Sequence, residues 1–320
     1  MAMFVPDHDG RPARSIPLRL LDRFPWLSAS HPIVARETKF HRYQHPPFIR
    51  KLSDPWSMLG YAAILHGCLF FIAILSVQHL APSLTPVFLP FLTPFGTLLT
   101  FAMLHSILYW TMLIGVSHFT LKSVGQDLNS GTWQELRLTA LRGGDILKGK
   151  VVAAFRSWWP TLRILALTRM LGLLIVPLAA MVQQQYDRPP LVALNFVGAM
   201  LFIVQPFVDA FMVCGLSALS VTVIRSALWA KVGAYALGAL AYGLLSGLSS
   251  LWLMFKTPMG AFAALFIPLG HWTPLVGAMV PSVNAVEFAQ RMALVTMTTF
   301  VLPLIFGFCA LGLAYRRTRG

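Results

Sequence analysis

The nearest approach to a known chemical motif in this chain lies at residues 144–151. There the sequence reads Gly-Asp-Ile-Leu-Lys-Gly-Lys-Val. A phosphate-binding loop has the same glycine and lysine spacing, but it follows a β-strand and ends in a serine or threonine that holds magnesium. Val151 stands in place of that hydroxyl, and no strand pattern precedes Gly144. We therefore expect no cofactor in this chain, so an ATP-driven function would need ATP and magnesium on a separate subunit.

A single carboxylate, Asp209, lies in the middle of a long apolar segment. A charged group at membrane depth is costly and usually faces a cavity or a partner. Asp209 could line a transport pathway, relay protons or cations, or contact a substrate. It could equally make a structural hydrogen bond to another helix near Pro206. The residues alone leave both interpretations open.

Two histidines, His66 and His105, lie in other apolar segments, where they could ligate haem. They have no haem-attachment motif and no paired spacing, so we expect them to be helix-packing residues. No catalytic dyad, catalytic triad or metal-ligand cluster emerges from the sequence. We predict that the chain is not an enzyme, has no catalytic residue and binds no metal.

A polar, basic island, Gly131–Lys150, separates two apolar segments and carries its own helix signals. Thr132 and Glu135 have the spacing of a capping box, which predicts a helix start. Gly143-Gly144 predicts the end of that helix, because glycine takes the left-handed turn without steric cost. Asp145 then predicts the cap of a second short helix. The first helix has an apolar face of Trp133, Leu136 and Leu141, so the island is shaped to receive a partner protein.

Two stretches resemble a known family. The run Gly-Thr-Trp-Gln-Glu-Leu-Arg-Leu-Thr at 131–139, followed by Asp-Ile-Leu-Lys-Gly-Lys at 145–150, resembles the signature of ABC-2 type transporter permeases. In that family the stretch follows the second transmembrane helix and contains the coupling helix, which docks on the ATP-binding subunit. The run His-Pro-Ile-Val-Ala-Arg-Glu at 31–37 resembles the start of the family's N-terminal interface helix.

The resemblance implies a permease subunit of an ATP-driven transporter, which we expect to be an exporter. Its partners would be an ABC ATP-binding subunit and a second permease chain, in a homodimer or heterodimer. Trp133 and Leu136 would fill a groove on the ATPase, while Glu135 and Arg137 would set the register. The residues expected to dock on the ATPase are Thr132, Trp133, Glu135, Leu136, Arg137, Arg142, Asp145 and Lys148.

Composition indicates a membrane protein independently of any motif. The 320 residues are 57% hydrophobic and only 11% charged, whereas soluble domains contain about 25% charged residues. The net charge of +14 would suggest nucleic acid as the partner of a soluble protein. In a membrane protein, Lys and Arg gather in cytoplasmic loops and meet anionic lipid. We therefore expect the lipid bilayer, and no nucleic acid, as a partner.

About 20 apolar residues span a bilayer, and the chain contains six such segments. They lie at approximately 56–77, 95–117, 162–182, 191–219, 228–255 and 293–315. With this assignment, 22 of the 25 Lys and Arg residues lie on one side, so the positive-inside rule predicts a cytoplasmic island and two cytoplasmic termini. The prediction is an all-α, six-span protein of the inner (plasma) membrane.

The remaining segments complete the predicted organisation. Residues 1–30 form a basic N-terminal arm, and residues 31–52 contain an amphipathic helix that lies in the membrane interface. Residues 53–320 form the permease domain, in which residues 122–160 are the coupling region. Residues 257–290 are apolar but interrupted by proline and glycine, which predicts a re-entrant segment before the sixth span.

Two other functions remain open. The chain could be a non-transporting integral subunit of a respiratory or photosynthetic complex, in which case bound haem or pigment would accompany it. It could also be a stand-alone proton-coupled carrier that uses Asp209, although the inverted repeat of many carriers is not visible.

Overall fold

The structure, a computed structural model, describes residues 31–41, 85–138, 141, 143–182, 189–224, 226–256 and 285–319. Within these ranges the regular elements are all helices and no β-strand occurs, as predicted. The long helices are α5 (Thr85–Asn129), α7 (Gly143–Val182), α8 (Pro189–Val223), α9 (Ala227–Lys256) and α13 (Leu302–Arg319). The short elements are α2 (Pro32–His41), α6 (Thr132–Leu138), α12 (Ala285–Thr296) and the π-helix η4 (Met297–Val301).

Three helical segments are long and apolar enough to cross a membrane. They are Phe196–Val223, Ala227–Leu245 and Val286–Thr318, which correspond to the predicted fourth, fifth and sixth spans. The predicted second and third spans lie within α5 and α7, which are 45 and 40 residues long. The predicted first span, the N-terminal arm and residues 257–284 of the predicted re-entrant segment lie outside the described residues.

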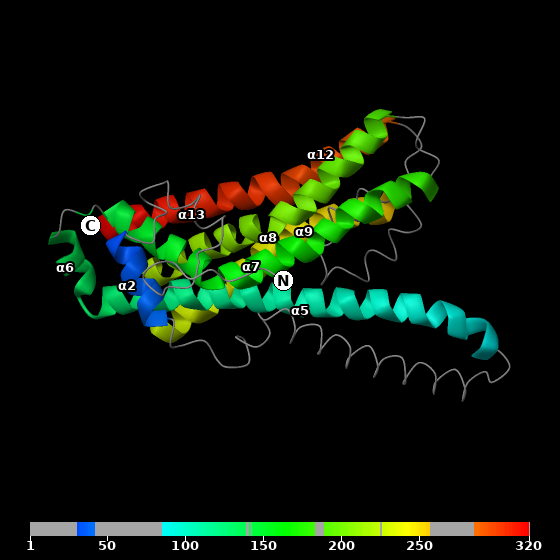
Figure 1. Ribbon diagram of the computed structural model, residues 1–320. Helices are drawn as coiled ribbons and strands as arrows, with labels where there is room; N and C mark the ends of the chain where they lie inside the picture. The colour runs from blue at the N-terminus through cyan, green and yellow to red at the C-terminus, as the bar shows by residue number, and fades with distance from the viewer. Residues whose placement is uncertain are drawn as a thin grey trace, which may run out of the picture.

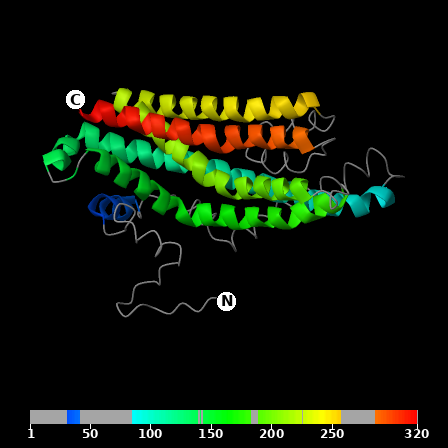
Figure 2. The ribbon, with the colours of Figure 1, turned by 90° about the horizontal axis from the view of Figure 1, so that it is seen from above.

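The long helices run side by side, and α8 lies at the centre of the bundle, in contact with α13, α7, α5 and α9 (Figures 1 and 2). Small buried residues on α8, including Ala210, Cys214 and Ala218, let its neighbours approach. At the crossing of α8 and α13, a Cβ built on Gly215 would lie 2.6 Å from the carbonyl oxygen of Gly307. That distance is too short for any side chain, so glycine is required at this crossing.

The side chains of α9 contrast with those of α8. Leu228, Trp229, Leu240 and Leu244 are among its exposed large apolar residues. Exposed apolar side chains along a helix of this length suit contact with lipid. Thus α8 is the more buried of the two helices, whereas α9 leaves much of its apolar surface uncovered by the described part of the protein.

The last apolar helix begins earlier than predicted. α12 starts at Ala285 rather than Ala293, and η4 joins it to α13, so residues 285–290 belong to this helix and not to a re-entrant segment. The prediction placed the start too late because Glu287 and Arg291 interrupt the apolar run. The structure buries Arg291, which is 1% exposed, with its guanidinium 5.6 Å from the centre of the Phe288 ring.

The polar island also differs from its prediction. The first short helix is present as α6, but it ends at Leu138, and Gly143 begins α7 instead of ending α6. The second helix is not short, because α7 continues to Val182. Asp145 lies in the first turn of α7 rather than at its cap, where a carboxylate still interacts favourably with the helix dipole.

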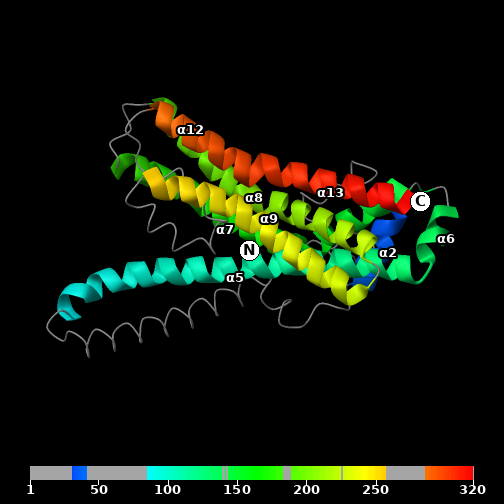
Figure 3. The same ribbon diagram turned by 180° about the vertical axis from the view of Figure 1, so that it is seen from behind.

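α2, α6 and the C-terminal end of α13 lie together at one end of the bundle, and α12 lies at the other (Figures 1 and 3). α2 crosses the bundle there and packs mainly on α7. It was predicted to lie in the membrane interface. In the structure Ile33 and Val34 are buried, at 2% and 0% exposed, so this part of its apolar surface is covered by protein.

Candidate functional site

The two stretches that carry the family resemblance meet at a buried ion cluster. Arg36 and Glu37 come from α2, Ser123 and Asp127 from α5, and Lys150 from α7. The Nζ of Lys150 lies 2.9 Å from Glu37 Oε1 and 2.6 Å from Asp127 Oδ2. Because Lys150 is 0% exposed, its charge depends entirely on these partners.

Arg36 closes the cluster from the solvent side. Its Nη2 donates to Glu37 Oε1 at 2.6 Å and to Asp127 Oδ2 at 2.5 Å. Two cations therefore balance two carboxylates, which is the arrangement in which a buried charge is tolerated. Lys150 also donates to the backbone oxygen of Ser123 at 2.7 Å, and the Ser123 hydroxyl donates to Glu37 Oε2 at 2.8 Å.

The cluster keeps Glu37 ionised. Burial alone would raise the pKa of this carboxyl. The nearby Lys150 ammonium and the hydrogen bonds from Arg36, Lys150 and Ser123 outweigh burial, so the pKa of Glu37 lies below its ordinary value. The charged state that ties α2 to α5 and α7 therefore persists at neutral pH.

Close packing surrounds the ions. A Cβ built on Gly149 would lie 2.9 Å from Cβ of Ile33, so α2 rests directly against the glycine that precedes Lys150. Residues 144–151 also do not form the phosphate-binding loop that their glycine and lysine spacing suggested. These residues form the first turns of α7 instead of a loop, and the lysine that such a loop would use is buried in ion pairs.

α6 lies beside this cluster and is fixed to the bundle by its apolar face. Trp133 is 4% exposed and packs in a buried cluster with Ile33, Val124 and Ile146, among others, while Leu136 and Leu141 pack against the same cluster. The Trp133 side chain, which was predicted to fill a groove on a partner, is therefore already covered by its own chain. Leu138, which is 89% exposed, is the apolar residue of α6 that faces outward.

The start of α6 differs from the predicted capping box. The Gly131 carbonyl, at a glycine with φ of 77°, accepts from the backbone N–H of Gln134 at 2.9 Å. The Thr132 hydroxyl pairs with the Ser130 hydroxyl at 2.8 Å rather than with the backbone of Glu135. Glu135 remains in the first turn and is exposed.

The other predicted docking residues divide into three groups. Lys148 is exposed on α7, and Asp145 and Thr132 are partly buried. Arg137 lies in α6, but its side chain is outside the described part of the structure, as is the whole of Arg142. Among the described side chains of α6, those exposed on its outward face are Gln134, Glu135 and Leu138.

A second polar cluster lies inside the bundle around Asp209. This residue is 2% exposed, and its carboxylate accepts a hydrogen bond from the Tyr109 hydroxyl of α5. Arg169 of α7 is 1% exposed and lies over the same ring, with its guanidinium carbon 5.2 Å from the ring centre. The cluster therefore joins α5, α7 and α8 through one shared tyrosine.

Arg169 is held on several sides. Its Nη1 donates to the Phe202 carbonyl at 2.6 Å and to Gln205 Oε1 at 3.3 Å, and its Nε donates to His105 Nε2 at 3.2 Å. His105, considered above as a haem ligand, thus uses Nε2 to accept this bond. Arg169 is one of the 22 basic residues counted on the cytoplasmic side, although it lies within the predicted third span at 162–182. In the structure it is buried inside the helix bundle.

The cavity beside Asp209 is small. It has a volume of about 10 Å³ and is lined by Gln205, Asp209, Tyr242, Leu245, Thr298, Thr299 and Pro303. Such a volume accommodates about one water molecule. The π-helix η4 brings both Thr298 and Thr299 to this cavity. Pro303 follows η4 closely and has no backbone N–H to donate to the preceding turn, which promotes the wider π-helical turn. Within the described residues, the Asp209 carboxylate is therefore enclosed by the helix bundle.

The sequence did not reveal either cluster as a unit. Arg36, Glu37 and Lys150 belong to the two family-like stretches, and Asp127 lies just before the second stretch. Nothing in the sequence indicated that these residues pair. The available signal was two acidic and two basic residues, each with an apolar residue three or four positions before or after it in the chain, such as Ile33, Val124 and Ile146. No protein-family model, curated protein or solved structure matches this chain.

Proposed function

We propose that this chain is the permease subunit of an ABC-2 type ATP-driven transporter, spanning the membrane six times with its island and both termini in the cytoplasm. The observation that carries the proposal is the meeting of the two family-like stretches in one buried ion cluster. Residues 31–37 and 131–150 are far apart in the chain, yet Glu37 and Lys150 pair at 2.9 Å. A shared structural role explains why both stretches occur in one protein.

The contacts of α6 suggest how a partner's motion would reach the membrane. Trp133 anchors α6 in the same apolar cluster as Ile33 of α2, Ala218 of α8 and Ala314 of α13. A force on the outer face of α6 would therefore move α6 together with these helices instead of bending it away from them. ATP binding would close two ATP-binding subunits, and two permease chains would enclose the transport path.

The exposed residues of α6 determine which substitutions would test docking on the ATPase. We propose that Gln134, Glu135 and Leu138 contact the ATPase, with Lys148 at the edge. A protruding leucine suits insertion into a partner's groove, and truncation of a central apolar anchor commonly costs about 2 kcal/mol of binding energy or more. Trp133 would act indirectly, by holding α6 in place.

The test is co-purification in mild detergent, followed by mass spectrometry and an ATPase assay. We expect an ATP-binding subunit in the purified complex, and we expect Leu138→Asp to lose it while remaining monodisperse. Val286→Asp is the matched control, because Val286 is also exposed, at 67%, and lies at the far end of the bundle. Retention of the ATPase by Leu138→Asp would reject this docking surface, whereas co-purifying haem or pigment without an ATPase would reject the transporter itself.

A further inference from the structure

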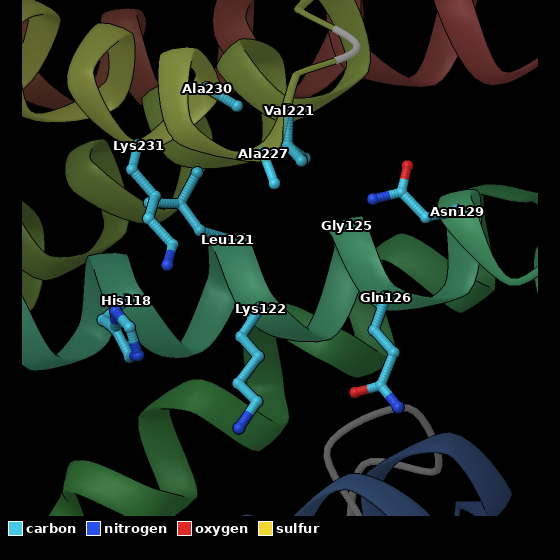
Figure 4. A pocket seen from close by; sticks show the side chains of 10 residues that line it. All are labelled: His118, Leu121, Lys122, Gly125, Gln126, Asn129, Val221, Ala227, Ala230 and Lys231. Atoms are coloured by element: carbon cyan, nitrogen blue, oxygen red, sulfur yellow. The ribbon is translucent and has the colours of Figure 1, made fainter.

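A cavity at the same end of the bundle as α6 lies between α5 and the junction of α8 and α9. It has a volume of about 380 Å³, and its lining includes His118, Lys122, Gln126, Asn129, Ala227 and Lys231. None of the described residues that line it is acidic. In Figure 4, Lys231 extends from α9 toward α5, and His118 and Lys122 leave α5 nearby.

The electrostatics of this cavity favour an anion. Partial desolvation and then the ammonium groups of Lys231 and Lys122 lower the pKa of His118. The first turn of α9, beginning at Ala227, also borders the cavity. Its early backbone N–H groups lack partners within the helix, and the helix dipole adds partial positive charge there.

The surroundings indicate where such an anion would come from. Leu228 and Trp229, which follow Ala227, are 67% and 63% exposed. Exposed tryptophan at the end of an apolar helix is typical of the membrane–water boundary. A cavity at such a boundary would lie at the level at which lipid headgroups present their phosphates, and its apolar rim would accommodate the beginning of acyl chains.

We propose that this cavity binds a phosphate-bearing anion, and specifically the headgroup of an anionic phospholipid. Lys231 and His118 would contact the phosphate, and the amides of Gln126 and Asn129 would hydrogen-bond the rest of the headgroup. The proposal does not depend on the transporter function, because it follows from the lining residues and from the exposed apolar side chains beside them.

The test is a titration of phosphatidylglycerol into the detergent-solubilised full chain, with bound lipid counted by native mass spectrometry. We expect phosphatidylglycerol to be retained in preference to phosphatidylcholine. Lys231→Gln should weaken its binding about fivefold or more, and Lys231→Gln/His118→Gln should weaken it further. Both residues are exposed, so these variants should fold.

Lys39→Gln is the control, since it removes the same charge from an exposed lysine on α2. Equal loss in Lys39→Gln, or unchanged binding in the double variant, would overturn the proposal. A parallel titration with glycerol 3-phosphate distinguishes the source of the phosphate. Saturable binding of that soluble anion, dependent on Lys231 and without lipid retention, would keep the anion site and assign it to a soluble ligand.

Discussion

Lys150 and Glu37 are 113 residues apart in the chain, and their ammonium and carboxylate groups pair at 2.9 Å in a site where Lys150 is fully buried. α2 is consequently fastened to α5 and α7 by charge as well as by apolar packing. An ammonium in such a position cannot exchange its partners for water. Lys150 can therefore be buried only when α2 occupies this position.

Removal of Lys150 should destabilise the protein strongly. Lys150→Met leaves Glu37 and Asp127 sharing one cation, Arg36, and uncompensated buried charge costs about 3 kcal/mol or more. The measurement is the apparent free energy of unfolding in detergent. Lys150→Met/Glu37→Gln leaves one cation and one carboxylate and should recover part of the lost free energy of unfolding. A loss in this double variant equal to the sum of the two single losses would contradict the charge-balance explanation.

The same cluster predicts a pH dependence. Because the pKa of Glu37 is lower in the folded protein than its ordinary value of 4.5, the ionised group contributes stability that is fully present above pH 4.5. This stability is lost as the pH falls below 4.5 through the pKa of the folded state. Thermal unfolding measured across this range should show a steeper loss for the natural chain than for Glu37→Gln. Parallel curves for the two proteins would contradict the assignment.

The polar cluster inside the bundle predicts that Arg169 is structural. Arg169→Met should lower the unfolding temperature and expression, because it leaves the Asp209 carboxylate buried without the cation that lies over Tyr109. Arg163→Met, an exposed position on the same helix, is the matched control and should have little effect.

Substitution of Asp209 distinguishes a structural role of this carboxylate from a functional one. Asp209→Asn/Arg169→Met should be more stable than Arg169→Met alone, since no buried charge remains unpaired. If Asp209→Asn alone abolished transport while leaving stability unchanged, a relay would replace the structural interpretation.

The contact between Gly215 and Gly307 predicts a steric cost for the smallest side chain. In Gly215→Ala, the new methyl would lie 2.6 Å from the Gly307 carbonyl oxygen unless α8 and α13 separate, and we expect a loss of about 1–3 kcal/mol. Gly312→Ala on α13 is the control, because nothing lies within 4 Å of the added carbon. It should be neutral or slightly stabilising, owing to the higher helix propensity of alanine.

The sequence by itself determined the membrane class and the places at which helices form, because apolar runs of the length of a bilayer leave the backbone few alternatives. It located the segments around Phe196–Val223 and Ala227–Leu245 and the short helix α6. It also indicated the apolar face of Trp133, Leu136 and Leu141, since helix periodicity is local.

Only the tertiary structure decided what that face contacts, because an apolar stripe is equally suited to a partner and to the rest of its own chain. Here it packs on the bundle and leaves Leu138 outside. The same limit applies to charge. A basic count treats every Lys and Arg as a loop residue, whereas Lys150 and Arg169 are stabilised inside the protein by residues from other helices. Their partners are distant in the chain, and only folding brings the opposite charges or acceptors within hydrogen-bonding distance.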